Sequence, residues 1–507
     1  MIKESVFVKF FINLFLILKT IRYSFIYRGL KKIKNTFFRL YSGSVIYRFF
    51  KNEDRIEKYS SNSEIIKFID KILACIVEFL RKIYGCLRKL NRQSINNLAY
   101  KLVNGNSRLC FHNITGFFLV IMAIVPGDKW NNLYGLIMAM FLLFVYVLVI
   151  SSGKDYNYSI SKFDFIMVIY MLATVLGVII SYSVADSIRV FMFFVTSFIL
   201  MIVISGSVKD IKSLEKIVGF VITGLVLTSL YCIYQGIKGV EIDLELVDMA
   251  ANAGMPGRAY STFENPNNYA EYLVMFIPFM AAFMLNRKKN FSKVIGISMI
   301  LIPFVALLYT YSRSCWVSFA ISVVVFIAFY NYKLLPVMAI IGIMCIPFLP
   351  QTIINRIFTI GSMKDTSNQY RILIWDGVLK MLKNCWATGI GLGPSAFSKL
   401  YPSFAHTNAV LAPHSHMLFM QILVETGILG FLSFGIYWVV TLKRLITAKI
   451  NSMSKELKNY LCASISSLTG IIFVSGVEYI WFYPRVMFMF FIMIGIIMAT
   501  LNIAKRG

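Results

Sequence analysis

The chain has 507 residues, of which 58% are hydrophobic and 15% are charged, and its formal net charge at pH 7 is +27. Its mean hydropathy is +0.71. A soluble core of this length does not need so much apolar surface, so the composition excludes an ordinary soluble domain and indicates a membrane protein.

The first 113 residues form a separate basic region, predicted to lie on the cytoplasmic side. They contain about 22 Lys and Arg against about 7 Asp and Glu, roughly +15 of the total charge. The apolar run of residues 6–18 is short for a span. A secretory signal would require a small-residue cleavage site after it, and none follows. Basic and aromatic residues interleave over residues 21–51, which predicts amphipathic helices in contact with anionic lipid headgroups. Nucleic-acid binding, the alternative for a basic stretch, is disfavoured beside so many apolar runs.

Residues 114–507 are predicted to form an all-α, polytopic membrane domain with about twelve transmembrane helices. A span needs about 20 apolar residues. Basic residues in alternate loops place both chain ends in the cytoplasm and the loop 351–415, between the ninth and tenth helices, outside. The predicted spans are residues 115–126, 132–152, 164–184, 188–206, 216–237, 269–286, 293–311, 314–331, 334–350, 416–442, 459–477 and 485–503.

Cysteine and glycine patterns indicate no metal or nucleotide site. The eight cysteines show no zinc-ligand spacing, and we expect structural thiols without a disulfide. The glycines of residues 389–393 lack the strand-then-helix setting of a dinucleotide site, so they predict a tight loop.

Lone arginines at predicted outer helix ends are the first functional signal. Basic residues are disfavoured on that side of a membrane, so these arginines need a reason. A guanidinium binds phosphate oxygens in bidentate fashion and keeps its proton. A lipid-linked diphosphate has its charged group at this depth, and arginines would stabilise the charge that grows on it as a leaving group. The set comprises Arg189, Arg258, Arg313, Arg371 and Arg485.

Three of the four histidines lie in residues 401–430, where a polar stretch runs into the tenth span. His416 is near the predicted helix start, where the positive end of the helix dipole favours a neutral ring. A neutral imidazole could take the proton from an attacking hydroxyl. If the helix begins by His414, the two rings would point about 200° apart. Glu425, about 13 Å deeper, cannot orient His416 directly and is predicted to make a structural hydrogen bond.

Four motifs occur in a fixed order along the chain: "GRAYSTFENPNNYAEYL", "SRSCW", "RILIWDGVLKMLKNCWATGIGLGPSAF" and "HSHMLFMQILVETGILG". Together they resemble the O-antigen ligase and polymerase superfamily of bacterial membrane glycosyltransferases, over roughly residues 115–503. The resemblance implies glycan transfer from an undecaprenyl diphosphate carrier on the outer face of the cytoplasmic membrane. It also implies that no metal, nucleotide sugar or other cofactor is needed.

The resemblance assigns roles residue by residue. The predicted catalytic residues are His416, Arg313 and Arg371. The family often has Asn directly after its histidine, but Met417 stands here, so the choice between the two histidines stays open. Glu478 and Arg485 could also simply pair with each other. The predicted substrate-binding residues are Arg258, Asn267, His414, Trp375, Glu478, Arg485 and Arg189.

The first functional hypothesis is a polymerase that joins lipid-linked repeat units into a surface polysaccharide, such as a capsule or teichuronic-type polymer. A ligase that moves finished glycan to a lipid, cell-wall or protein acceptor is the alternative. A transporter of such lipids is disfavoured because few polar residues occur at mid-span. The expected partners are the glycan donor, a glycan or lipid acceptor, anionic membrane lipids, a polysaccharide flippase and chain-length proteins, and no nucleic acid.

Overall fold

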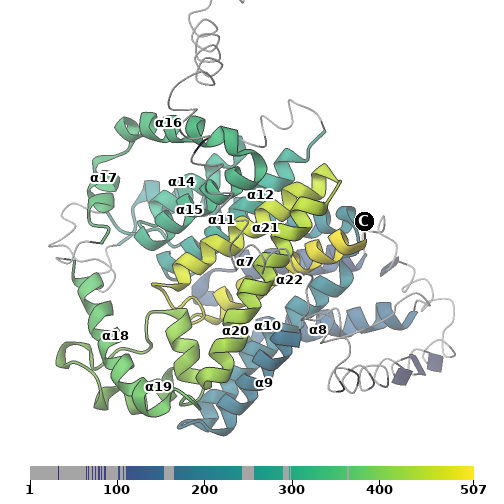
Figure 1. Cartoon of the computed structure of the whole chain (residues 1–507). Helices are drawn as coiled ribbons and strands as arrows, with labels where there is room; N and C mark the ends of the chain where they lie inside the picture. The colour runs from purple at the N-terminus through teal and green to yellow at the C-terminus, as the bar shows by residue number, and fades with distance from the viewer. Residues whose placement is uncertain are drawn as a thin grey trace, which may run out of the picture. The chain divides into compact units, whose positions relative to one another are not determined.

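The structure is a computed structural model that describes residues 110–152, 165–241, 256–288, 298–361 and 365–506, with Gly296 and isolated positions before residue 108. All regular structure in these residues is helical, as the composition predicted (Figure 1). The amphipathic helices predicted within residues 1–113 lie almost entirely outside the described residues.

A helix is present in each of the twelve predicted spans. Among the described residues, eight stretches are long and apolar enough to cross a membrane, and one of them, Arg313–Cys345, contains two helices, α15 and α16. The protein is therefore a multi-pass membrane protein, while twelve crossings and cytoplasmic chain ends stay predictions. The helices are α7 (Phe111–Ile124), α8 (Asn132–Ser152), α9 (Phe165–Ile179), α10 (Val184–Ser207), α11 (Ile211–Lys238), α12 (Pro266–Leu285), α14 (Leu301–Tyr309), α15 (Arg313–Asn331), α16 (Leu335–Cys345), α20 (Leu418–Asn451), α21 (Lys455–Ser475) and α22 (Pro484–Arg506).

The core of the bundle is built on two sets of helices. The apolar helix α22 is buried almost throughout and packs along α10, as expected of a helix that is apolar on all sides. The helices α12, α15 and α21 pack against one another. Since α12 and α15 begin where α21 ends, their polar end residues are brought to one face of the bundle.

The predicted loop 351–415 is largely helical and packed. It contains α17 (Gln351–Phe358), α18 (Thr366–Cys385) and α19 (Pro394–Leu400), which Figure 1 shows along one edge of the bundle. One face of α18 packs on the stacked rings of Phe397 and Tyr401, and on Val424 of α20. This apolar cluster fixes the position of α18.

Helix α20 is broken at Gly427, whose φ of 64° and ψ of −166° suit glycine. The glycine-rich segment lies against the break: the N–H of Ile390 donates to Val424 O at 2.8 Å, and that of Ile428 donates to Ala387 O at 3.3 Å. Three of its glycines have φ between 79° and 101°. The predicted tight loop is therefore present, and it supports the break in α20.

Gly427→Ala is expected to destabilise the protein by about 2–4 kcal/mol, because the new Cβ would lie 2.3 Å from Ala387 O in a backbone region that alanine avoids. Thermal unfolding in detergent measures the effect. Gly435→Ala in the same helix is the matched control, since its Cβ would meet open space. Alanine there should be neutral or slightly stabilising. Equal unfolding temperatures for the two variants would show that the break tolerates a side chain.

Candidate functional site

A cavity of about 450 Å³ lies where α12 and α15 begin and α21 ends. One face of α18 lines it through Asn368, Arg371, Ile372 and Trp375, which follow the spacing of a single helix face. The charged residues of the lining are Arg258, Arg313, Arg356, Arg371, Asp365 and Glu478. The structure therefore gathers three of the sequence-predicted arginines, together with Asn267, Trp375 and Glu478, and adds Arg356 and Asp365.

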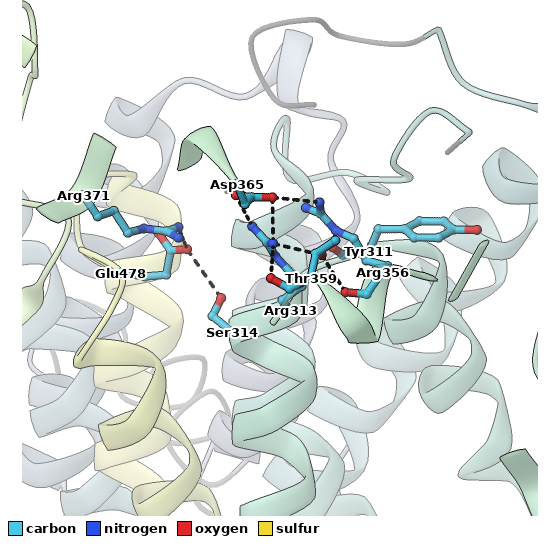
Figure 2. Close-up of polar contacts among 8 residues, drawn as sticks. All are labelled: Tyr311, Arg313, Ser314, Arg356, Thr359, Asp365, Arg371 and Glu478. Atoms are coloured by element: carbon cyan, nitrogen blue, oxygen red, sulfur yellow. Dashed lines mark hydrogen bonds and ion pairs between the residues drawn. The ribbon is translucent and has the colours of Figure 1, made fainter. Parts of the chain in front are cut away.

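Arg313 and Asp365 form a bidentate ion pair in the cavity (Figure 2). Two nitrogens of Arg313 contact the two carboxylate oxygens of Asp365, each at 2.8 Å. Arg313 Nη1 also donates to Thr359 O at 2.9 Å and to Thr359 Oγ1 at 3.0 Å. Arg356 Nη1 lies 4.0 Å from the same carboxylate.

The carboxylate of Asp365 is only 1% exposed. Burial acts to raise its pKa, but the hydrogen bonds and charge of Arg313, with the charge of Arg356, lower the pKa below its usual value. Asp365 is therefore a buried anion. The sequence reasoning missed both Asp365 and Arg356, although the acid stands six residues before Arg371 in the same predicted outer loop.

Arg371 forms an ion pair with Glu478. Its Nη2 lies 2.5 Å from Glu478 Oε1, and the hydroxyl of Ser314 donates to the same oxygen at 3.4 Å (Figure 2). The alternative pairing of Glu478 with Arg485 is wrong, because Glu478 faces α18 and α15. The Nε of Arg371 is buried and has no hydrogen-bond partner among the described residues, so this guanidinium retains a donor for a ligand.

Arg258 is held by the motif that begins α12. The side chain of Asn265 caps the helix by accepting from the N–H of Asn267 at 2.8 Å. The side chain of Asn267 in turn accepts from Arg258 Nη2 at 2.5 Å, and Arg258 Nε donates to Thr310 O at 2.9 Å. Burial, followed by the charge of Arg356, lowers the pKa of Arg258 to about 9. An incoming anion would stabilise this desolvated cation.

His414 and His416 precede α20, which begins at Leu418. Because the helix does not begin by His414, it does not turn the two rings about 200° apart. Their centroids are 4.1 Å apart. The N–H of His416 donates to His414 Nδ1 at 3.1 Å, with His416 in the left-handed region at a φ of 52°. The cavity lining does not include His416, but the N–H of Leu418 donates to Glu478 O at 3.1 Å, so the histidine turn adjoins the Arg371–Glu478 pair.

Both rings are neutral at pH 7. Burial lowers the pKa of His416 to about 4; Glu478 opposes this shift and Arg371 adds to it. Burial, then the neighbouring His416 and Arg371, lowers the pKa of His414 well below its usual value. The lowered pKa values agree with the neutral rings expected from the sequence, and burial is their largest cause. The Nδ1 of His416 is buried without a hydrogen-bond partner in the described part of the chain.

A chain of hydrogen bonds fixes the backbone before His416. The indole of Trp375 donates to Ser415 O at 3.0 Å, and the N–H of Ser415 donates to Gln421 Oε1 at 2.8 Å. Gln421 Nε2 donates to Glu425 Oε1 at 3.0 Å. Glu425 therefore acts as a structural acceptor, as predicted. The sequence reasoning missed Gln421, although it lies one helical turn before Glu425.

Comparison with known proteins adds the family. Residues 297–435 match the O-antigen ligase family. This stretch is therefore similar to the O-antigen ligase family. The chain is also 23% identical, over 264 residues, to the teichuronic acid biosynthesis protein TuaE of Bacillus subtilis (strain 168). That match covers 49% of this chain and 52% of the relative, so it spans about half the length of each protein.

The resemblance inferred from the four motifs is confirmed. The matched stretch contains Arg313, Arg371 and both histidines of the turn. Arg258 and Glu478 come from outside the matched stretch, and the fold brings them to the cavity.

Three predicted substrate-binding residues are absent from the cavity lining: His414, described above, Arg485 and Arg189. Arg485 donates to the backbone carbonyls of Met122 at 2.8 Å and Thr262 at 2.6 Å, and also to that of Val125. Its guanidinium stacks 4.7 Å from the ring centre of Trp130. These contacts join the start of α22 to the end of α7. The side chain of Arg189 is exposed on α10 and lines no part of the cavity.

Arg485→Gln is expected to destabilise the protein by about 3 kcal/mol, because three buried carbonyls lose charge-assisted hydrogen bonds. Binding of a lipid diphosphate by the remaining folded protein should not change. Thermal unfolding and ligand titration measure the two effects. The control, Arg189→Gln, should change neither. If Arg485→Gln kept its stability and lost ligand binding, the original substrate-binding assignment would be right.

Proposed function

We propose that this membrane protein of surface polysaccharide synthesis is a glycosyltransferase that uses an undecaprenyl-diphosphate-linked glycan donor, outside the cytoplasmic membrane. The observation that carries the proposal is the convergence of four arginines in one cavity. They come from four separate elements between residues 258 and 371: the segment before α12, and α15, α17 and α18. A structural role does not account for so many guanidinium groups around an open space.

The charge of the cavity supports a diphosphate ligand. Four guanidinium groups face two carboxylates, which leaves an excess of two positive charges. A diphosphate that links a lipid to a sugar carries two negative charges near neutral pH, so it would balance the site. Arginine forks bind phosphate oxygens in bidentate fashion, and their attraction for the leaving diphosphate grows as the glycosidic bond breaks.

The apolar part of the lining supports a lipid-linked donor. Val317 of α15 and Phe473 of α21 line the cavity and are 40% and 51% exposed at the bundle surface. The cavity therefore joins a charged region to an apolar surface of two membrane-spanning helices. An amphiphile with a diphosphate head and a polyprenyl chain fits this arrangement, whereas a nucleotide sugar would leave the apolar side in contact with a polar ligand.

The proposed reaction is a displacement at the anomeric carbon of the donor. An acceptor hydroxyl attacks this carbon, the bond from the carbon to the diphosphate oxygen breaks, and the lipid diphosphate leaves with the bonding electrons. Arg258, Arg313 and Arg371 stabilise the leaving group. Neutral His416 takes the proton of the hydroxyl and later releases it to water. His414 holds the backbone N–H of His416 and is a positioning residue.

Polymerisation is favoured over ligation because the relative is named for the biosynthesis of teichuronic acid, a polymer. In a polymerase the acceptor is a second lipid-linked glycan, whereas in a ligase it is a different lipid, cell-wall or protein acceptor. A flippase would supply donors at the outer face, and chain-length proteins would limit the product. A transporter is disfavoured because the charged lining gathers at one end of the helices.

Purified protein in lipid nanodiscs is expected to extend an undecaprenyl-diphosphate-linked oligosaccharide. Arg371→Ala should lower kcat/KM by about 10²–10³-fold, because the leaving group loses a charged donor. His416→Ala should lower it by about 10²–10⁴-fold, because the general base is lost. Lys383→Ala, an exposed site at the other end of α18, is the matched control and should keep the rate. Gel analysis of labelled glycan measures chain growth.

Each outcome of this assay separates the functional hypotheses. Chain growth supports the polymerase, and transfer only to an added acceptor supports the ligase. Passage of glycan across vesicles without bond formation would instead favour the transporter. Full activity of His416→Ala would remove the base assignment while leaving the diphosphate site in place.

The acidic limb of the pH profile is expected to lie near the His416 pKa of about 4. A base must be unprotonated, so its activity is full above its pKa and is lost as the pH falls through it. The value of kcat/KM should therefore stay level from pH 7.5 to 5.5, whereas a base with the usual pKa of 6.5 would lose about tenfold over this range. Recovery of the rate at pH 7.5 after exposure to pH 5.5 controls for unfolding. A tenfold fall by pH 5.5 would contradict the assignment.

A further inference from the structure

Asp365 occupies an anion site made by the protein itself. Its two oxygens lie 2.8 Å from Arg313, and one of them lies 4.0 Å from Arg356 (Figure 2). Two guanidinium groups around a pair of oxygens match the recognition of a phosphate group. The carboxylate therefore lies at the position on Arg313 where a phosphate of the donor would bind.

The contacts around the Arg313–Asp365 ion pair would allow a phosphate to replace the carboxylate on Arg313. Arg313 is held independently by Thr359, through the backbone carbonyl at 2.9 Å and the hydroxyl at 3.0 Å, so its guanidinium stays in place without Asp365. The start of α18 depends on the backbone carbonyl of Asp365, which accepts from Asn368 N and Gln369 N at 3.1 and 3.2 Å. The contact of the carboxylate with Arg313 can therefore be lost while the Thr359 contacts and these two backbone hydrogen bonds remain.

An excess of guanidinium groups in the site would slow release of the product. The product, a lipid diphosphate, carries at least as much negative charge as the donor, so the arginines hold it firmly. A resident carboxylate that competes for Arg313 weakens this hold. The nearby Arg356 gives Asp365 a second cationic partner while a phosphate is bound to Arg313.

We propose that Asp365 is an exchangeable counter-ion: the donor diphosphate displaces it from Arg313, and its return promotes release of the lipid diphosphate product. The inference rests on the proposed function, and it adds a residue that controls the rate of product release at the same site. Asp365 touches no reacting atom, so it acts on product affinity and on kcat, not on bond cleavage. The exchange transfers no proton or electron; it replaces one anion on Arg313 with another.

Asp365→Asn in the full-length protein in nanodiscs tests the proposal. The amide keeps the shape of the side chain but competes poorly for Arg313. Undecaprenyl diphosphate is expected to bind on the order of tenfold more tightly, and kcat should fall by a similar factor. The value of kcat/KM should not fall, because the carboxylate competes with the donor as well as with the product. Rapid mixing should show a burst of one turnover followed by slow release. Isothermal titration of undecaprenyl diphosphate measures the affinity.

Asp376→Asn is the matched control, because it removes one negative charge from the same helix at an exposed carboxylate that pairs with Lys380 at 2.6 Å. Its product affinity and kcat should stay at the parent values. Asp365→Glu keeps the charge and should bind product within about threefold of the parent. This second variant tests the proposal if Asp365→Asn does not fold.

Unchanged or weaker product binding by Asp365→Asn would overturn the proposal and leave Asp365 with a structural role. Tighter binding by Asp365→Glu would also overturn it, because side-chain shape would then matter more than charge. These results differ from failure of the proposed function, in which the parent protein itself would neither bind undecaprenyl diphosphate nor transfer glycan.

Discussion

The structure around the cavity depends on the need to compensate buried cations. Four guanidinium groups line the cavity at the end of an apolar helix bundle. Burying one partner of an ion pair without the other costs several kcal/mol, so each arginine is tied to an acceptor. Asp365 and Glu478 neutralise two of the charges, while Arg258 and Arg313 also use an amide and backbone carbonyls. The remaining positive excess favours an anion.

The fold meets this constraint with rigid elements from different parts of the chain. The starts of α12 and α15 and the end of α21 hold Asn267, Arg313 and Glu478 at one level, because these helices pack against one another over their length. Helix α18, with Asp365 directly before its first residue, then carries Arg371 across the same face, and its apolar side is fixed on Phe397 and Tyr401. Sites held by packed helices keep their geometry better than sites on free loops. The packed helices therefore hold the ion pairs of Arg313, Arg356 and Arg371 around the cavity.

The sequence predicted the helices and much of the cavity for physical reasons that can be named. Apolar runs of about 20 residues reveal spans without tertiary information, and lone arginines on the outer side stand out because the membrane disfavours them there. Arg258, Arg313 and Arg371 were recognised in this way. Their partners were not, because pairing is set by three-dimensional packing: Arg356 and Asp365 lie in a segment that was expected to be a loop. Arg485 shows the opposite error, since an arginine at a helix end can equally bind backbone carbonyls.

Burial determines the base strength of the histidines at the site. Their turn lies before α20 because Ser415 is held by Trp375 on one side and Gln421 on the other, a pairing that no sequence period reveals. Burial makes His416 a neutral but weak base, and the charge of Arg371 weakens it further. Under the proposed function, a bound diphosphate offsets the charge of Arg371 and so removes one of the two causes of the lowered pKa. The base then becomes stronger when the donor is present, and the same arginine couples leaving-group binding to activation of the acceptor.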